Sequence, residues 1–529
     1  MNKINKLSLF INTIRYLRCK QIYYRLFYFI KEKFKGLLGL KYNFSRNSNA
    51  KNLMLLNSIE LLEDGMDNYE FKFINLSKKF SDKIDWNYSD YGKLWTYNLT
   101  YFEFLNRKES VKHGLELISA FIENIVIIRD GLDSYPISLR GINWIKFLVC
   151  NNVNNKIIND SLYAQYYILL NKLEYHLLGN HLLENGFSLL FGAYYFEDLT
   201  LYERAKEILE VELEEQILAD GAHFELSPMY HQIILFRLLD CINLITNNNW
   251  RGKELLRLFL QKAGIMLSWL EEMTFRNGEI PLFNDSTNFI APNSKSLFKY
   301  AKLMSVKANR TRLNESGYRK YRNDNYEMIV DVGKIGPDYL TGHSHSDTFN
   351  FELYINDKPV IVDTGVSTYE NTHTRFAQRS TMAHNTVIIE NFNQSEVWSS
   401  FRVARRAYVD IIDEGDDFIE VVHDGYKRIG AWHKRRFESF EREIKIIDFV
   451  ESRKKYLCRA FFHFHPDECI KKKNNRIITS DLEIQFKGNT ELDVKDYNYA
   501  PEFNKLIKSK CVVAFFNTNT TLKTILRKR

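Results

Sequence analysis

The segment 342–347, Gly-His-Ser-His-Ser-Asp, concentrates side chains that can transfer protons or bind a metal ion. In an extended chain alternate residues share one face, so His343, His345 and Asp347 can point in the same direction. Two imidazoles and a carboxylate suit Zn²⁺, which takes nitrogen and oxygen ligands in tetrahedral geometry. The alternative interpretation is a turn with solvated histidines.

A carboxylate and a further histidine follow this segment. Asp363 closes the apolar run 360–362, a costly place for a carboxylate without a partner, and His384 lies in the motif Ala-His-Asn-Thr. Four nearby side chains form a basic and aromatic set suited to an anionic polymer: Arg375, Arg379, Trp398 and Arg402.

The segment 179–185, Gly-Asn-His-Leu-Leu-Glu-Asn, opens an apolar run with helical spacing. Asn180 suits an N-cap position, and Glu184 then lies near His181 on a shared helix face. The alternative is an ordinary helix start with a histidine whose hydrogen bonds are satisfied.

The segment 220–231 is dense in titratable residues for a connection between two helical runs. Loops often carry binding groups, and Tyr230 can act as an acid or a base if a neighbouring cation lowers its pKa. The alternative is a tyrosine that anchors a turn.

A third polar group lies in the segment 140–144, Arg-Gly-Ile-Asn-Trp. The Arg140 guanidinium and the Asn143 amide can hold a carboxylate, and the Trp144 indole can stack on a sugar ring. Taken alone this signal is weak, since an arginine beside a tryptophan is common on protein surfaces.

Two different patterns predict the elements that must position these residues. From about 88 to 310, apolar residues recur every three or four positions between short breaks rich in Asn, Asp and Gly, which predicts stacked helical hairpins. After about 325, short alternating runs rich in Val, Ile and Phe predict an antiparallel β domain, a sandwich of two sheets. The expected parts are an N-terminal arm (1–50), a helical domain (51–310), a linker (311–325) and a β domain (326–529), with a cleft between the two domains.

The length and composition fit this division. A chain of 529 residues is long enough for two or three domains, and 45% apolar with 26% charged residues excludes global disorder. No run of about 18 apolar residues predicts a transmembrane helix, and no signal peptide is evident. The six scattered cysteines predict buried thiols, not a disulfide framework.

The positive charge is concentrated in residues 1–50. This arm carries eleven Lys or Arg residues and one acid, Glu32, for a net charge of +10, whereas the rest of the chain sums to −3. Apolar residues interleave with the bases, which predicts a basic amphipathic helix. Such a helix can lie on an anionic membrane surface or dock on its own body, and the sequence leaves both open. No nucleic-acid-binding motif accompanies the charge, so we expect no nucleic-acid partner.

Together these stretches resemble the heparinase II/III-like polysaccharide lyases, a bacterial family that includes alginate- and heparin-lyase-like members. The matching stretches occur in the family's order and cover most of residues 85–410. They are RGINW (140–144), NHLLENGFSLLFGAYYF (180–196), DGAHFELSPMYHQ (220–232), GHSHSDTFNFEL (342–353), VIVDTGVSTY (360–369), AHNTV (383–387), SEVW (395–398) and FRVARR (401–406). The resemblance implies an α+β multidomain fold, with an incomplete (α/α) toroid followed by an antiparallel β-sandwich.

The resemblance also implies roles for individual residues. Asn180, with His181 beside it, would neutralise the C6 carboxylate of a uronic acid; Tyr230 would be the acid, and the base for one C5 stereochemistry; His343 would be the alternative base. Glu184 would be an acidic helper, and Arg140 with Asn143 would bind substrate. The implied metal ligands are His345, Asp363 and His384, which would hold a structural or site-shaping Zn²⁺.

The expected function is cleavage of an anionic, uronic-acid-containing polysaccharide by β-elimination. This polysaccharide substrate is the expected partner. Two alternatives stay open: a non-catalytic glycan-binding or assembly factor in bacterial surface-polysaccharide production, and a metal-dependent glycan hydrolase. Secreted relatives often carry an export signal, whereas the segment RYLRCKQIYYRLFYFIKEKF (15–34) resembles the basic arm of bacterial relatives from surface-polysaccharide gene sets. Cell-envelope, cytoplasmic and membrane-peripheral locations all stay open.

Overall fold

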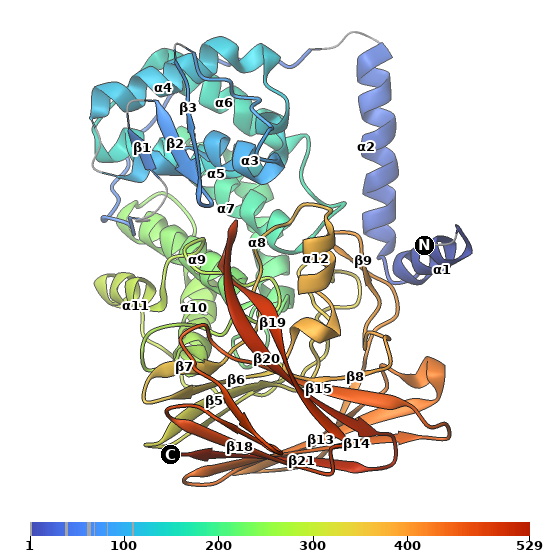
Figure 1. Cartoon of the computed structure of the whole chain (residues 1–529). Helices are drawn as coiled ribbons and strands as arrows, with labels where there is room; N and C mark the ends of the chain where they lie inside the picture. Colours follow the sequence, from blue (N-terminus) through green and yellow to red (C-terminus); the bar gives the residue numbers. More distant parts are fainter. Residues whose placement is uncertain (1–2, 38–40, 61–64, 68, 82, 108–109) are drawn as a thin grey trace.

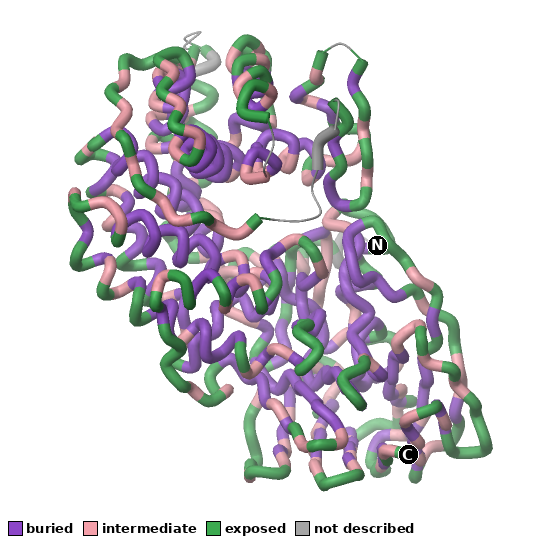
Figure 2. Tube along the Cα trace, turned by 90° about the vertical axis from the view of Figure 1, so that its left-hand side faces the viewer, coloured by how far each residue is buried: buried purple, intermediate pink, exposed green. Residues whose placement is uncertain are grey.

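The computed structural model describes residues 3–37, 41–60, 65–67, 69–81, 83–107 and 110–529. Figure 1 shows a helical domain packed against one edge of a β domain, with an N-terminal pair of helices beside them. Buried residues run continuously through both domains in Figure 2. The order of helices first and antiparallel strands second confirms the prediction.

The helical domain consists of successive helices joined by short connections. Its helices are α3 (Lys93–Tyr101), α4 (Val111–Asn124), α5 (Ser134–Cys150), α6 (Lys156–Leu170), α7 (Gly179–Phe196), α8 (Leu199–Gln216), α9 (Pro228–Asn247), α10 (Lys253–Met273) and α11 (Ser294–Leu303). Side chains of Asn155, Asp198 and Ser227 accept backbone N–H groups at the starts of α6, α8 and α9, which fixes where these helices begin. Helix α7 packs against α5, α8 and α9, so nearly every one of its residues is buried.

A small sheet that the sequence pattern did not predict lies within the range 51–310. It consists of β1 (Gly65–Asp67), β2 (Glu70–Phe73) and β3 (Leu76–Lys79), paired antiparallel. Alternation places Phe71 and Phe73 on one face of β2, where they pack on Trp95 and Phe104 of the helical core. These strands are only three or four residues long, too short for a clear periodic signal.

The β domain is built from one large and two smaller antiparallel sheets. The eight-stranded sheet contains β11 (Val409–Gly415), β12 (Phe418–His423), β13 (Ala431–Ser439), β14 (Glu443–Ser452), β21 (Thr521–Lys528), β18 (Leu482–Lys487), β17 (Arg476–Ile478) and β16 (Lys471–Lys473). One four-stranded sheet contains β4 (Tyr318–Arg322), β5 (Tyr326–Asp331), β6 (Phe351–Ile355) and β7 (Lys358–Ile361); the other contains β19 (Glu491–Glu502), β20 (Lys505–Asn517), β15 (Leu457–His463) and β8 (Val387–Ile389). A separate two-stranded ribbon pairs β9 (Val397–Trp398) with β10 (Arg402–Val403), and a short helix, α12, spans His373–Gln378.

The sheets pack face to face around an apolar core. Phe351 of β6 contacts Phe437 in the eight-stranded sheet and Phe462 in the other four-stranded sheet. An isolated bridge between Ile361 and Phe464 connects the two smaller sheets. The result is a sandwich, as the alternating runs predicted.

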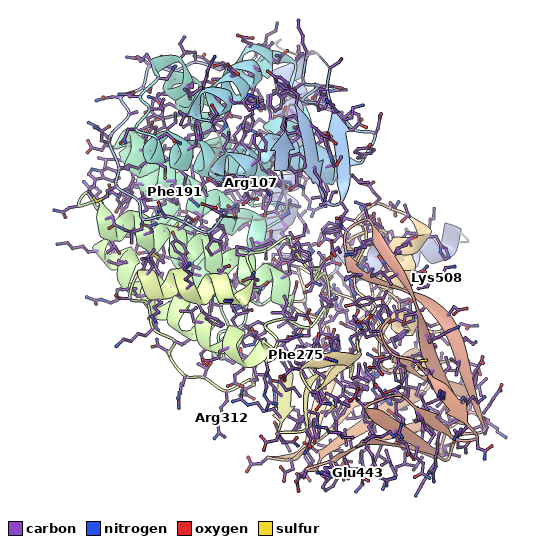
Figure 3. The ribbon with its side chains drawn as sticks, turned by 60° about the vertical axis from the view of Figure 1, so that its left-hand side comes forward. Arg107, Phe191, Phe275, Arg312, Glu443 and Lys508 are labelled. Carbon is purple, nitrogen blue, oxygen red and sulfur yellow. The ribbon has the colours of Figure 1, made fainter. Side chains whose placement is uncertain are left out.

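The two domains meet over a broad junction. Phe275, which follows α10, stacks on Tyr354 of β6 with ring centroids 3.7 Å apart (Figure 3). The tip of the β19–β20 hairpin reaches the helical domain in Figure 1, where Asn504 Nδ2 donates to the Ile74 carbonyl at 2.8 Å. These contacts hold the edge of the sandwich against the toroid.

The predicted linker 311–325 is partly wrong, because it contains β4. This strand pairs with β5 along its whole length and begins the first sheet. Its basic residues suggested a solvated connection, but Arg319 pairs with Glu414 and Lys320 with Glu327.

The N-terminal arm docks on the body of the protein. It consists of α1 (Lys3–Ile14) and α2 (Cys19–Leu37). Tyr24 stacks on Tyr175 at 4.7 Å between ring centroids, and Tyr28 OH donates to the Leu173 carbonyl at 2.6 Å. No helix in the described part of the chain combines the length and apolar character needed to cross a bilayer.

The cysteine expectation is half correct. All six cysteines are free thiols. Cys241, Cys458 and Cys511 are buried as predicted, whereas the other three, Cys19, Cys150 and Cys469, are exposed.

Candidate active site between the domains

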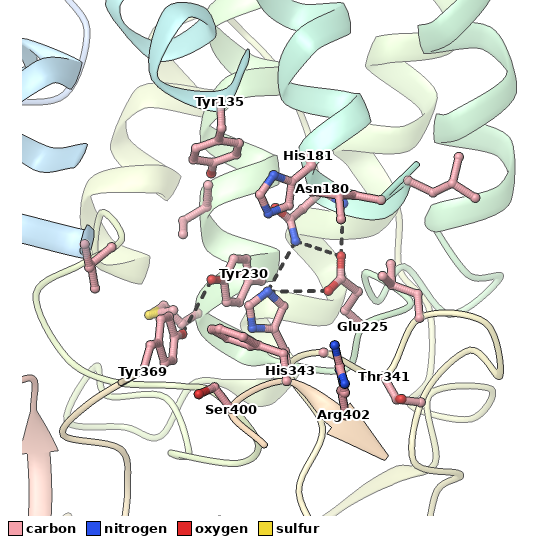
Figure 4. A pocket seen from close by; sticks show the side chains of 18 of the residues that line it. Tyr135, Asn180, His181, Glu225, Tyr230, Thr341, His343, Tyr369, Ser400 and Arg402 are labelled. Carbon is pink, nitrogen blue, oxygen red and sulfur yellow. Dashed lines mark hydrogen bonds and ion pairs between the residues drawn. The ribbon is translucent and has the colours of Figure 1, made fainter. Parts of the chain in front are cut away.

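A cavity of about 740 Å³ lies where the helical domain, the β domain and the N-terminal arm meet. Helices α3, α5, α7 and α9 line one side, and the loops around 338–343, 369–371 and 400–406 line the other. Figure 4 shows Asn180, Tyr230 and His343 converging in it from three separate segments. A cavity at a domain junction in which a few polar groups converge among apolar side chains is a favoured place for a binding site.

Asn180 lies in the first turn of α7, and a carboxylate fixes its orientation. Glu225 Oε1 accepts hydrogen bonds from the Asn180 backbone N at 3.0 Å and from its side-chain Nδ2 at 2.9 Å. An anionic group at a helix N-terminus also complements the helix dipole. The predicted N-cap role of Asn180 is therefore wrong, because Glu225 from another segment caps this helix.

Backbone geometry just before Asn180 requires a glycine. Gly179 has φ +59°, and a Cβ there would approach Leu340 Cδ2 to 2.1 Å and Glu225 Oε1 to 2.8 Å. A side chain would therefore displace the carboxylate that holds Asn180.

Tyr230 is fixed by the start of α9. Ser227 Oγ accepts from the Tyr230 backbone N at 3.3 Å, and Pro228 occupies the first helical position, where no N–H is needed. The Tyr230 ring packs on the His343 imidazole with centroids 3.9 Å apart, and its hydroxyl lies 3.5 Å from Tyr369 OH.

His343 is oriented by a buried carboxylate that the sequence analysis did not identify. Its Nδ1 lies 2.9 Å from Asp285 Oδ2, and the same carboxylate binds both terminal nitrogens of Arg375. Because an ionised Asp285 only accepts hydrogen bonds, His343 Nδ1 carries the proton that it donates there. The opposite nitrogen, Nε2, faces Asn180 Nδ2 at 3.4 Å and is the atom able to accept a proton from a substrate.

The pKa values of two buried carboxyl groups at the site, Asp285 and Glu225, are lowered by neighbouring groups. Burial would raise the pKa of Asp285, but the Arg375 charge and hydrogen bonds from His343 and His345 hold that pKa well below its usual value. Burial would likewise raise the pKa of Glu225, but nearby His343 and His223 and the Asn180 hydrogen bonds lower it. Both carboxyl groups are therefore ionised.

The phenol of Tyr230 is protonated. Burial raises its pKa well above 10, and Tyr369, Asp285 and Glu225 raise it further. The group can therefore donate a proton as the cavity stands, and it becomes a base only if a bound cation or donor lowers that pKa.

His181 lies in the cavity wall beside Asn180. Its Nδ1 is 3.0 Å from Glu174 Oε1, and its ring packs on Tyr135 at 4.7 Å. Burial lowers the pKa of His181, but Glu174 outweighs burial and raises it overall. The charge of Glu184 adds to this rise, while its own hydrogen bond is to Arg237 Nε.

The predicted substrate-binding residues of α5 lie outside the cavity. Arg140 is fully buried, and donates to the Gln165 side chain at 2.8 Å and to the carbonyls of Thr100 and Gly131, both at 2.9 Å. Asn143 donates to the Tyr101 carbonyl at 2.9 Å, and Trp144 is enclosed in the aromatic core. These three residues hold the helical domain together, so their predicted contact with substrate is wrong.

Three further residues that were predicted to contact substrate, Glu184, Arg375 and Arg379, are buried and bind other protein groups. Glu184 accepts from Arg237 Nε at 2.9 Å. Arg375 holds Asp285, and Arg379 donates to the carbonyls of Ser344, Ser399 and Ser400. None of the three lines the cavity within the described part of the chain, and Arg375 acts on the site through Asp285.

The three expected metal ligands lie together in the β domain. His384 Nδ1 donates to Asp363 Oδ2 at 2.7 Å, and the His345 and His384 rings are 5.3 Å apart. His345 Nε2 contacts Asp285 Oδ1 at 2.8 Å. The other ring nitrogen of His345, Nδ1, has no hydrogen-bond partner among the described residues, and neither does His384 Nε2. Two buried imidazole nitrogens beside a carboxylate fit Zn²⁺ in donor type. Among described residues, no three His, Cys, Asp or Glu side chains form a ready metal cluster.

Several residues of the site were not predicted from the sequence. Asp285 lies between Asn284 and Ser286, so its sequence surroundings are polar and carry no clear signal of burial. Glu225 stood in a recognised polar segment without an assigned role. The sequence did not place Tyr369 or the arm residues at the cavity, because only tertiary packing brings them there.

Comparison with known proteins identifies the chain's relatives. The C-terminal model of the heparinase II/III-like proteins matches residues 306–525, and the model of the heparinase II/III N-terminus matches residues 142–312. A heparin-sulfate lyase from Bacteroides stercoris is 26% identical over 258 residues, 42% of this chain and 38% of the relative. A heparin-sulfate lyase from Pedobacter heparinus is 25% identical over 244 residues, 41% of this chain and 36% of the relative. The matched part therefore spans well under half of these curated relatives.

Solved structures share the fold. A crystal structure of heparinase III matches with a TM-score of 0.66 at 16% identity, covering 85% of this chain and 80% of that one. The heparan sulfate lyase of Pedobacter heparinus matches with a TM-score of 0.55 at 17% identity, covering 87% and 81%. These structures confirm the expected fold class, an incomplete (α/α) toroid followed by an antiparallel β-sandwich.

Proposed function

The chain belongs to the heparinase II/III-like family, and from that premise we propose that it is a polysaccharide lyase acting on an anionic, uronic-acid-containing glycan. The observation that carries the proposal is the convergence of Asn180, Tyr230 and His343 in one cavity. An amide donor, a protonated phenol and an oriented imidazole are the groups that β-elimination of a uronate needs.

The first requirement is to stabilise negative charge. Removal of the C5 proton of a uronic acid places charge on its C6 carboxylate, and the Asn180 amide would donate to that carboxylate. Glu225 holds this amide from behind, so its geometry exists before substrate binds. His181, whose raised pKa favours the imidazolium form, would add positive charge on the same side.

The second requirement is a base and an acid. His343 Nε2 would take the C5 proton while the C4–O4 bond breaks and the C4=C5 double bond forms. Tyr230, which is protonated, would give its proton to the departing O4. For the opposite C5 configuration Tyr230 would serve as both base and acid, which requires the bound substrate or a neighbouring cation to lower its pKa.

We propose Zn²⁺ as a site-shaping metal, bound by His345, Asp363 and His384. A bound zinc would supply positive charge and cross-link three segments of the β domain. The unpartnered nitrogens His345 Nδ1 and His384 Nε2 support this proposal.

The substrate class follows from the relatives. Both curated relatives are named heparin-sulfate lyases, so we propose a glycosaminoglycan of that type as the first candidate. Another uronate-bearing bacterial polymer would meet the same chemical requirements, because the proposed mechanism reads the carboxylate and the C5 proton.

The test is ultraviolet absorbance of the unsaturated product across a panel of acidic polysaccharides. We expect wild type to release such a product from at least one of them, and Asn180→Ala and the double variant Tyr230→Phe with His343→Ala to lose at least about 10³-fold in kcat. A solvent-exposed substitution far from the cavity, Lys508→Gln, serves as the control. Full activity in the double variant would exclude these residues as acid and base.

We further propose that the outer face of α2 contacts an anionic membrane surface. Leu26, Phe29 and Ile30 are exposed there beside basic residues, a pattern typical of interfacial helices. Wild type should sediment with vesicles containing anionic lipid, and the triple serine variant of these residues should not. Equal sedimentation of the two proteins would contradict the proposal.

A further inference from the structure

The N-terminal arm forms part of the cavity wall. Residues from both helices, including Ile14 of α1 and Gln21 and Arg25 of α2, line the cavity beside the catalytic candidates. The arm therefore borders the proposed substrate site, in addition to any role in location.

Specific contacts hold this wall in place. Gln21 is buried, and its Nε2 donates to the carbonyls of Leu177 at 3.2 Å and Tyr339 at 3.3 Å. Arg18 pairs with Glu215 and lies over the Tyr339 ring at 3.7 Å. At the other end of the wall, Trp398 Nε1 donates to Thr13 Oγ1 at 2.9 Å. Arg25 lies one helical turn beyond Gln21, so these contacts fix its backbone.

Two cavity arginines differ from the other cations around them. Lys93 pairs with Asp133 at 2.9 Å, Arg237 with Glu184 at 2.9 Å, and Arg406 with Asp338 at 3.7 Å. Arg25 and Arg402 line the same cavity, but neither forms an ion pair with a carboxylate of the described residues.

Arg25 on α2 and Arg402 on β10 line the same cavity, and both side chains are solvent-exposed. Partial burial lowers the pKa of Arg25, and the positive charge of Arg402 lowers it further. Arg402 is held over the Trp398 ring at 4.9 Å, and Figure 4 shows it pointing into the cavity that holds His343 and Glu225. Two neighbouring guanidinium groups without a counter-ion form a site that an oxyanion would stabilise.

We propose that Arg25 and Arg402 form a subsite for an oxyanion, a carboxylate or a sulfate, on a sugar next to the one that is cleaved. This proposal rests on the glycan-lyase function proposed above. The arm would thus supply half of a specificity site, and the ribbon β9–β10 the other half. Guanidinium groups suit both oxyanions because they donate two parallel hydrogen bonds.

The test measures glycan binding in a catalytically disabled background, Tyr230→Phe, by titration calorimetry. The probes are a heparin tetrasaccharide, the same tetrasaccharide without its sulfates, and neutral maltotetraose. We expect Arg25→Gln and Arg402→Gln each to raise the Kd for heparin tetrasaccharide about tenfold, and Arg25→Lys to raise it less. Lys33→Gln, which removes the same charge from the exposed end of the arm, is the matched control and should leave Kd within about twofold.

The outcomes separate this proposal from the lyase function. A tenfold effect that persists with the desulfated probe assigns a carboxylate to the subsite, and an effect seen only with the sulfated probe assigns a sulfate. Equal Kd values for Arg25→Gln, Arg402→Gln and Lys33→Gln would overturn the subsite, even if wild type releases unsaturated product. An Arg25-dependent Kd without any product would support the subsite and contradict the lyase. Failure of all three probes to bind would overturn the subsite.

Discussion

Replacing Asp285 by Asn tests how the buried charges support the catalytic candidates. The Asp285 carboxylate has no exposed surface, and it binds Arg375 through both oxygens and His343 Nδ1 at 2.9 Å. Asp285→Asn keeps the size of the side chain and removes its charge. Two consequences follow, one for stability and one for the histidine.

The stability consequence arises from Arg375, which would remain buried without a counter-charge. Removal of one partner from a buried ion pair costs about 3–5 kcal/mol of unfolding free energy. The histidine consequence arises because the new amide can donate to Nδ1, so the proton moves to Nε2 and that atom can no longer accept one. The corresponding loss in kcat is roughly 10⁴-fold, the scale for amidating a carboxylate that orients a catalytic histidine.

Urea unfolding and steady-state kinetics check the two consequences separately. Asp467→Asn is the control, since Asp467 is 91% exposed and its loss changes the net charge equally. The control should change unfolding free energy by less than about 0.5 kcal/mol. If Asp285→Asn unfolds within about 1 kcal/mol of wild type and keeps kcat within about tenfold, then Asp285 neither neutralises Arg375 nor orients His343.

Three more predictions follow from the buried network and the proposed metal. Arg140→Met should cost about 3 kcal/mol or more in urea unfolding, because it leaves two buried carbonyls and the Gln165 amide without a donor, while KM stays unchanged; a raised KM with wild-type stability would restore its substrate role. In Glu174→Gln the partner that raises the pKa of His181 is gone. Because the pKa of His181 is higher in the folded protein than the unfolded value of 6.5, the pair stabilises the wild-type fold below that value and loses this effect as pH rises through the folded pKa. The variant should therefore lose more unfolding free energy at about pH 5.5 than at about pH 9. An equal loss at both pH values would contradict the pairing of His181 with Glu174. For the metal, purified wild type should contain about one zinc per chain by elemental analysis, and His384→Ala should contain none and melt at lower temperature; metal-free wild type with unchanged melting would exclude a structural zinc.

The sequence predicted the catalytic candidates better than their supports. Asn180, Tyr230 and His343 come from polar segments at helix starts and loops, where function concentrates, and they meet in the cavity. Their partners Glu225 and Asp285 were not predicted, because hydrogen bonds between residues 45 and 58 positions apart depend on tertiary packing.

The wrong predictions for helix α5 arise because the helix is buried. Helix α5 is buried on nearly all sides, so its spacing carries no distinction between an inward and an outward face. Arg140 therefore resembled a surface arginine, although two backbone carbonyls and the Gln165 side chain hold it inside the core. For α2 the amphipathic pattern was correct, but only the structure shows that one side of the helix docks on the body and borders the cavity.

The measurement that tests the central claim most directly is cleavage of a sensitive glycan in water enriched with ¹⁸O, read by mass spectrometry. Elimination forms C4=C5 by loss of the C5 proton and adds no water. The two product masses should therefore sum to the substrate mass, with no ¹⁸O in either product. Incorporation of one ¹⁸O per cleavage would identify a hydrolase and contradict the roles proposed for Asn180, Tyr230 and His343.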